Sequence, residues 1–332
     1  MKKILILGSS SFAGASMTNF LLSKNFKIYG TYRREKNKQY LPYLRNKKLK
    51  NFVNYKVDFN KRPKVLLNII KKVKPYIILD FASICVVNQS WQYPETYINT
   101  NILYKSFIFK NLKNYKFLKK YIYISTPEIF GSSSKLISEN SAKFNPSTPY
   151  ATSKLSAELL LKNYVKNFKL PVVIARFSNF FGPGQPTYRL IPKVIACIDQ
   201  KIKFPLEGSG VTKRNYIYAY DFCNGIYKII TKGKNGKVYH FSGTKYYKTI
   251  DVIKMICKLK KCNWKKIIKK TKMRIGQDYE YKLDSNKTKK NLKWKPLYSL
   301  NEALKEIINY NKITKTKFLY KDLIYRDTNF NS

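Results

Sequence analysis

ILILGSSSFAG, at residues 4–14, is the stretch that decides the fold predicted for this chain. Four apolar residues typical of a strand lead directly into Gly8, and Gly14 lies at the start of a helical pattern. A strand, a tight turn and a helix N-terminus bring backbone N–H groups and the positive end of the helix dipole to one place. The stretch therefore predicts a βα unit that binds a pyrophosphate.

The glycine spacing of this turn is that of GxxGxxG, with Ser11 at the middle glycine position. A serine can still approach a phosphate and donate a hydroxyl hydrogen bond. We therefore expect the cofactor to contact Gly8, Ser11, Phe12 and Gly14. A purely structural turn with two glycines is the alternative, and the place of the turn in an alternating α/β chain favours the cofactor site.

Strand-like and helix-like segments alternate through the first half of the chain. We expect strands at 4–7, 27–32, 52–57, 76–82, 121–125 and 172–177, and helices at 12–24, 63–73, 94–112 and 149–168. Alternation of this kind builds a doubly wound parallel sheet, with its ligand crevice at the carboxyl ends of the strands. The predicted fold class is therefore α/β of the Rossmann type.

The pattern changes after about residue 180 to loops rich in glycine and proline, such as GPGQP and LEGSG. We expect an NAD(P)-binding domain with the catalytic residues at 1–178 and a smaller, mainly substrate-binding lobe at 179–312. That lobe is expected to be interleaved with the last elements of the sheet. Residues 313–332 form a C-terminal arm to which the sequence assigns no role.

The strong positive charge does not by itself predict a nucleic-acid partner. The 332 residues include 66 Lys and Arg against 18 Asp and Glu, a net charge of +48. The excess is mostly lysine and is spread from end to end, without a basic tail or an RNA-binding signature. A general bias in residue use explains it better, so we expect no nucleic-acid partner.

The apolar stretches predict a cytoplasmic protein without a membrane partner. The longest is YIILDFASICVV, about a dozen residues interrupted by Asp80, which is too short to cross a bilayer. The N-terminus runs straight into a strand without a cleavage signal.

Cysteine and histidine usage excludes several kinds of site. The five cysteines are scattered and never spaced as CxxC, which favours a reducing compartment over disulfides or zinc, and we expect no metal. His240 is the only histidine and lies in VYHFSG, where we expect a strand, so a structural role is predicted.

The end of the second predicted strand bears on the choice of cofactor. NAD-binding folds usually place an acidic residue there, whereas this chain has Arg33 and Arg34. A guanidinium pairs well with a 2′-phosphate, so the cofactor is NAD or NADP, with NADP favoured. A merely basic surface is the alternative. Asp58, at the end of the third strand, is placed to meet the adenine amino group.

YATSK places Tyr150 and Lys154 one helical turn apart on the same face. An ammonium group beside a tyrosine lowers the phenol pKa from about 10 and makes it a usable base. With the glycine turn and the strand ending at Ser125 and Thr126, the pair predicts an acid/base site.

At this point the chain resembles, over about residues 2–310, the extended short-chain dehydrogenase/reductase family, in particular its nucleotide-sugar epimerases and dehydratases. The resemblance implies a catalytic triad of Thr126, Tyr150 and Lys154, where Tyr150 removes the sugar 4-hydroxyl proton and Lys154 also holds the nicotinamide ribose. It further implies a homodimer formed through the Tyr/Lys helix and a role in making polysaccharide precursors.

Other segments extend the resemblance, among them RFSNFFGPGQ, YRLIPKVI, KRNYIYAYDF and NLKWKP. It implies that Ala82 and Ser83 line the cofactor. It also implies substrate contacts, which fall on Asn179, Arg189, Arg214 and Arg274. The chain departs from the family pattern at Cys85, Val86, Gln277 and Glu280, which leaves the nucleobase and sugar open.

STPEIFG, at residues 125–131, indicates the reaction. A 4,6-dehydratase oxidises C4, removes the C5 proton and expels the C6 hydroxyl, which requires a carboxylate beside the triad, and Glu128 supplies it. The dTDP-glucose dehydratases resemble STDE at this turn and the GDP-mannose type resembles STSE. Pro127 cannot donate a proton, so Glu128 would have to take the C5 proton and also protonate the departing C6 oxygen.

The prediction is therefore a nucleotide-sugar 4,6-dehydratase, a lyase, with transient C4 oxidation by bound NAD(P)+. Three alternatives stay open: a 4-epimerase, a UDP-glucuronate decarboxylase and, outside the enzymes, a dinucleotide-binding regulator.

Overall fold

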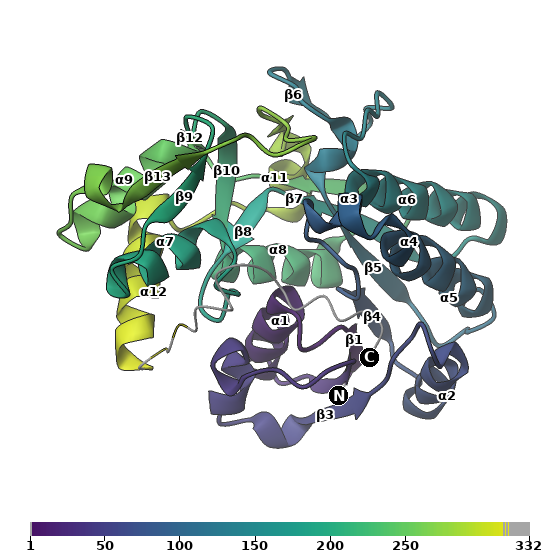
Figure 1. The fold of residues 1–332 in the computed structure, drawn as a ribbon. Coiled ribbons are helices and arrows are strands. Elements are labelled where there is room, and N and C mark those ends of the chain that lie inside the picture. Colours follow the sequence, from purple (N-terminus) through teal and green to yellow (C-terminus); the bar gives the residue numbers. More distant parts are fainter. Residues whose placement is uncertain (1, 315, 317, 319–332) are drawn as a thin grey trace.

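The computed structural model describes residues 2–314, 316 and 318, and its centre is a seven-stranded sheet. The strand order is β11-β7-β5-β4-β1-β2-β3, and every neighbouring pair is parallel (Figure 1). The bounds are β1 (Lys3–Leu7), β2 (Lys27–Tyr32), β3 (Phe52–Lys56), β4 (Ile77–Asp80), β5 (Lys120–Ser125), β7 (Val172–Phe177) and β11 (Val238–Phe241). The predicted Rossmann-type fold is confirmed.

Helices cover both faces of the sheet because each carries one apolar stripe. On one face, α1 (Phe12–Leu22), α8 (Ala219–Lys232) and α11 (Asn286–Leu292) share a buried core with β1 and β7. On the other face, α2 (Pro63–Val73), α5 (Tyr104–Leu112) and α6 (Pro149–Phe168) pack against the same strands. The chain order reverses between β1 and β4, which opens the crevice in which α/β folds bind ligands.

The predicted helix at 94–112 is interrupted. α4 (Pro94–Ile98) continues into a π-helical turn, η4 (Asn99–Leu103), before α5 begins. A π turn inserts one extra residue into a helix and re-aims the side chains that follow it. Here the turn carries Asn101, which is fully buried beside α6.

The second lobe contains two small sheets and its own core. β8 (Asn179–Phe181), β10 (Lys213–Tyr218) and β12 (Tyr246–Lys248) form one sheet, and β9 (Phe204–Glu207) pairs with β13 (Ile268–Thr271). Its helices are α7 (Leu190–Asp199), α9 (Thr249–Leu259), α10 (Trp264–Ile267) and α12 (Leu300–Ile313). β11, which lies within this region of the chain, returns to the main sheet beside β7.

Short elements complete the described chain. They are β6 (Leu136–Ile137), paired with β14 (Lys282–Leu283), together with α3 (Gln89–Gln92), η1 (Lys38–Tyr40), η2 (Pro42–Arg45), η3 (Leu49–Asn51) and η5 (Pro127–Phe130). Within residues 2–314, none of the helices is long and apolar enough to cross a membrane. The predicted arm at 313–332 lies mostly outside the described residues.

Candidate active site

The glycine turn lies between β1 and α1, at the carboxyl edge of the sheet. Gly8 has a φ of 78°, a conformation that favours glycine, and Ser11 caps α1 by accepting a hydrogen bond from the Gly14 N–H. A Cβ on Gly14 would lie 2.2 Å from the Gly8 carbonyl oxygen. The turn therefore packs backbone against backbone, and the helix N-terminus faces the crevice.

The other predicted adenosine contacts follow the neighbouring strands. Arg33 and Arg34 come directly after β2 and are half-buried. Asp58 follows β3 and accepts a 3.0 Å hydrogen bond from the Asn60 N–H. Since β1, β2 and β3 are adjacent and parallel, the three positions lie along the same edge as the glycine turn.

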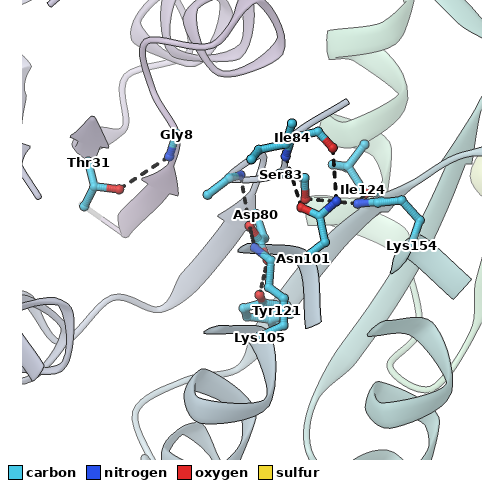
Figure 2. A network of polar contacts seen from close by, with 11 residues as sticks. Gly8, Thr31, Asp80, Ser83, Ile84, Asn101, Lys105, Tyr121, Ile124 and Lys154 are labelled. Carbon is cyan, nitrogen blue, oxygen red and sulfur yellow. Dashed lines mark hydrogen bonds and ion pairs between the residues drawn. The ribbon is translucent and has the colours of Figure 1, made fainter. Parts of the chain in front are cut away.

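A buried polar network fixes the exit of β4 (Figure 2). Asp80 accepts hydrogen bonds from Lys105 Nζ, at 2.6 Å to both carboxylate oxygens, and from Tyr121. The Ala82 N–H donates to the same carboxylate at 3.0 Å. Asp80 therefore shapes the loop where Ala82 and Ser83 are predicted to line the cofactor.

Asn101 connects this loop to the catalytic helix. Its side chain exchanges two 3.0 Å hydrogen bonds with the backbone of Ile84 (Figure 2). It donates a third, also of 3.0 Å, to Ser153 Oγ. Sequence reasoning missed Asp80 and Asn101 as parts of the site. Asp80 could have been found from the sequence, because a charged residue that interrupts an otherwise apolar strand needs a buried polar partner.

Lys154 lies beneath the crevice. Its Nζ donates to Ser83 Oγ at 3.1 Å and to the Ile124 carbonyl at 2.7 Å, and it lies 4.1 Å from the centre of the Tyr123 ring. Burial, with a smaller effect from the charge of Lys105, lowers the pKa of Lys154 to about 7. The amine is therefore held at a fixed point between β4, β5 and α6.

Tyr150 stands in the first turn of α6, which begins at Pro149 as predicted and is capped by Thr148. Burial, followed by the nearby Glu128 carboxylate, raises the pKa of Tyr150 well above its usual value, and a hydrogen bond with Thr126 opposes the rise. The expectation that Lys154 lowers this pKa is not met in the chain alone. Burial has the largest effect on the pKa of Tyr150, and the Lys154 amine bonds to Ser83 and the Ile124 carbonyl rather than to the phenol.

Glu128 lies in η5, two residues beyond Thr126, with a half-buried side chain. Burial raises its pKa to about 7. The charge of Asp278 adds to the rise, and the guanidinium groups of Arg214 and Arg189 oppose it. A carboxyl with a pKa near neutrality can both take and return a proton. Pro127 is buried at the first position of the same turn.

Two of the predicted substrate contacts lie close to Glu128. Arg189, at the N-terminal cap of α7, donates to the backbone oxygen and to Sγ of Cys85, both at 3.2 Å. Arg214, on β10, donates to the carbonyls of Asp278, Tyr279 and its neighbour Lys213.

The other two lie further out on the second lobe. Asn179 begins β8 and accepts a 2.8 Å hydrogen bond from the Tyr281 hydroxyl. Arg274 is largely exposed and forms an ion pair with Glu207. Its charge still acts on Glu128, though less than that of Arg214.

Titratable side chains do not gather into a metal site here. No group of three or more His, Cys, Asp and Glu that could hold a metal ion occurs among the described residues. His240, the only histidine, lies in β11 as expected and is fully buried.

The chain is similar to known proteins over most of its length. The GDP-mannose 4,6 dehydratase family model matches residues 5–307. The dTDP-D-glucose 4,6-dehydratase of Dictyostelium discoideum is 34% identical over 77% of this chain, and the chain spans only 62% of that protein's length. The dTDP-glucose 4,6-dehydratase of Haemophilus influenzae is 26% identical, with 93% of this chain and 98% of that protein covered.

Solved structures give the same picture. The dTDP-glucose 4,6-dehydratase of Bacillus anthracis, in complex with NAD, is 25% identical with a TM-score of 0.84, covering 95% of this chain and 98% of that one. The UDP-glucuronic acid 4-epimerase of Bacillus cereus, also with NAD, has a TM-score of 0.82 at 25% identity, covering 94% and 99%. The chain belongs to the GDP-mannose 4,6 dehydratase family, among the nucleotide-sugar dehydratases of the extended short-chain dehydrogenase/reductases.

Proposed function

We propose that the protein is a nucleotide-sugar 4,6-dehydratase, which converts an NDP-hexose into an NDP-4-keto-6-deoxyhexose and water. The observation that carries this proposal is the position of Glu128. Its carboxyl lies beside Thr126 and acts electrostatically on Tyr150, and its pKa is about 7. Removal of a C5 proton requires such a group, whereas a simple exchange of configuration at C4 does not.

The residues divide the proton chemistry between them. Tyr150 takes the proton of the sugar 4-hydroxyl, and Thr126 orients that hydroxyl through its own hydrogen bond to the tyrosine. Lys154, fixed by Ser83 and the Ile124 carbonyl, holds the ribose of the cofactor. A nicotinamide dinucleotide held there would supply the hydride chemistry at C4 and C6.

Glu128 then carries the elimination. Once C4 is a ketone, the C5–H bond is acidic, and the Glu128 carboxylate removes that proton. The C5–C6 double bond forms as the C6–O bond breaks, and Glu128 passes the C5 proton to the leaving hydroxyl, which departs as water. When C6 later gains the hydride, C5 regains a proton, and the proton that Tyr150 took from the 4-hydroxyl balances it. Pro127 has no proton to give, so Glu128 is the acid as well as the base in this proposal.

The cofactor is proposed to be NAD or NADP, held by the Gly8–Gly14 turn. NADP is favoured by Arg33 and Arg34, which follow β2. The comparisons do not support that preference, because the B. anthracis and B. cereus relatives are complexes with NAD. Titration of purified protein with NAD and NADP, with Arg33→Ala alongside, decides between them.

The substrate nucleotide is proposed to lie against the second lobe. In this proposal Arg189 and Arg214 bind its pyrophosphate, and Asn179 and Arg274 contact its outer parts. Names of the relatives make dTDP-glucose the first substrate to test and GDP-mannose the second.

The test is to incubate the purified protein with dTDP-glucose, GDP-mannose, CDP-glucose and UDP-sugars and to follow product mass. Loss of one water is the expected result. A product of unchanged mass and inverted C4 would establish the epimerase instead, and loss of carbon dioxide would establish the decarboxylase. A dinucleotide that is bound but never reduced by any sugar would support a regulator.

Glu128→Gln separates the steps of the proposed reaction. This variant keeps the shape of the side chain but removes the base. Reduction of the bound cofactor by the sugar should persist, while water loss should fall about a hundredfold or more. Loss of both steps together would place Glu128 in binding rather than in elimination.

A further inference from the structure

The segment from Gly276 to Tyr281 crosses from the second lobe to the catalytic turn and is fastened there. Ser147 Oγ donates to the Gly276 carbonyl at 3.3 Å, and the Tyr279 N–H donates to Ser132 Oγ at 2.8 Å. A backbone hydrogen bond of 2.8 Å joins the Ser133 N–H to the carbonyl of residue 280. The segment therefore touches both the chain just after Glu128 and the chain just before Tyr150.

Asp278 is the buried carboxylate of this segment. Asp278 is only 7% exposed, and it accepts a 3.3 Å hydrogen bond from the Ser132 hydroxyl. The Ser147 hydroxyl is shared between this carboxylate and the Gly276 carbonyl. Both serines belong to the loop between the catalytic turn and α6. Burial raises the pKa of Asp278, while these hydroxyls and Arg214 oppose the rise and favour the carboxylate.

Arg214 is held so that it does not neutralise this carboxylate directly. Its guanidinium donates to the backbone carbonyls of residues 278, 279 and 213, and its centre lies 4.7 Å from that of the Tyr281 ring. Its hydrogen bonds are thus directed at peptide oxygens. The negative charge of Asp278 therefore remains effective at Glu128.

Glu128 is surrounded mostly by cations. The charged and titratable groups that act on it or respond to it come from several elements: Tyr150, Arg189, Arg214, Arg274, Asp278 and Tyr281. Three guanidinium groups would hold Glu128 as a permanent carboxylate, which is a poor acid. Asp278 is the one carboxylate of this set.

We propose that Asp278 is a positioning residue for Glu128, whose buried negative charge lets Glu128 hold the C5 proton and pass it to the departing C6 oxygen. This inference rests on the proposed dehydratase function. It answers how one carboxyl works as both base and acid where Pro127 supplies no proton. The proton transfers are those of the elimination described above, and Asp278 itself neither gains nor loses a proton.

The first test needs no substrate. Infrared difference spectra between the wild type and Glu128→Gln report the titration of the Glu128 carboxyl alone. We expect a midpoint near the pKa of about 7 and, in the isosteric Asp278→Asn background, a midpoint about one unit lower. An unchanged midpoint would overturn the inference, whatever reaction the protein catalyses.

The second test uses turnover. With Asp278→Asn, kcat for water loss should fall about tenfold, with KM nearly unchanged, and the acidic limb of the pH profile should move to lower pH. Asp278→Glu should restore part of the rate because it keeps the charge. Asp251→Asn on α9 removes one charge far from the site and serves as the control.

A second variant guards against misfolding. Ser147→Ala removes a hydrogen-bond donor to Asp278 and so makes that carboxylate easier to protonate. The acidic limb of the pH profile should therefore also move to lower pH, by a smaller amount than in Asp278→Asn. A slower Asp278→Asn or Ser147→Ala enzyme whose pH profile coincides with that of the wild type would show a purely structural role and overturn the inference. Absence of water loss in the wild type would instead refute the proposed function, while the infrared result would still stand.

Discussion

At Gly14, the space that a side chain would need is already filled by backbone. A Cβ there would lie 2.2 Å from the Gly8 carbonyl oxygen, and both atoms belong to elements that cannot easily move. We predict that Gly14→Ala lowers stability by about 1–3 kcal/mol and weakens dinucleotide binding more than tenfold. Ser299→Ala, which removes the cap of α12 in the second lobe, should cost about 1 kcal/mol and leave dinucleotide binding unchanged, and it serves as the comparison in thermal melts and cofactor titrations.

The pKa of Glu128 sets the working range of the proposed enzyme. Only the ionised carboxyl can take the C5 proton, and Glu128 is ionised above its pKa of about 7. The rate of water loss is therefore expected to fall as the pH drops below 7. Steady-state kcat measured across the neutral range, with cofactor reduction recorded separately, checks this. A rate independent of pH between 5 and 7 would remove Glu128 from the elimination step.

At the scale of elements, a buried chain of polar groups joins α6 to the far edge of the sheet. Glu158 on α6 pairs with Arg176 on β7 at 2.6 Å, and Arg176 Nη1 lies 3.1 Å from Nε2 of His240 on β11. The other ring nitrogen of His240 lies 3.1 Å from the Ile137 carbonyl. A guanidinium can only donate, so the imidazole is neutral, with its proton on Nδ1.

This chain of groups makes stability depend on pH. Burial, followed by the charge of Arg176, lowers the pKa of His240 from 6.5 to about 3. As the pH falls from about 6.5 toward 3, His240 takes up a proton in the unfolded chain but stays neutral in the folded chain. The free energy of unfolding therefore decreases over this range by up to about 5 kcal/mol.

His240→Gln should flatten that slope. Urea denaturation at a series of pH values, for the wild type and the variant, measures it. Equal slopes below pH 6 in both proteins would contradict this account.

The elements that local patterns specify were predictable, and those set by distant contacts were not. Strand β7 and helices α2 and α6 match the predicted ranges because their apolar spacing and starting prolines are local signals. The strands expected at 76–82 and 52–57 end earlier, at Asp80 and Lys56. The π turn at Asn101 has no local sequence signature, because its partners in hydrogen bonding, Ile84 and Ser153, are distant in the sequence.

The same division holds for the site. Thr126, Glu128, Tyr150 and Lys154 lie near one another in sequence, so motif spacing brought them together. Asp278 approaches Glu128 only because the second lobe folds back over the catalytic turn. The pKa of Tyr150 depends on burial, which spacing alone cannot supply.

At the scale of the whole molecule, apolar side chains on α4, η4 and α6 reach the surface. Ile98, Leu103 and Leu159 are 47%, 59% and 45% exposed on neighbouring elements (Figure 1). We propose that this surface joins two copies of the chain. Leu103→Asp combined with Leu159→Asp should convert a dimer to a monomer in light scattering, while Leu136→Asp, exposed elsewhere, should not.

The net charge of +48 invites a separate measurement. A protein that binds nucleic acid through basic side chains loses affinity steeply with salt. We predict weak binding at low salt and none at physiological salt, measured by fluorescence anisotropy with labelled RNA and DNA. Tight binding that survives physiological salt would contradict the view that the lysines reflect a general bias.

The single, buried histidine gives this protein an internal reporter. A proton NMR spectrum of the chain should contain one set of imidazole ring signals, all from His240, and in D2O its Cε1 proton can be followed downfield of the tyrosine and phenylalanine rings. In folded molecules those signals should not move with pH near neutrality, whereas in unfolded molecules they should titrate normally. The folded fraction of any variant can thus be read from one resonance, without isotope labelling or an extrinsic dye.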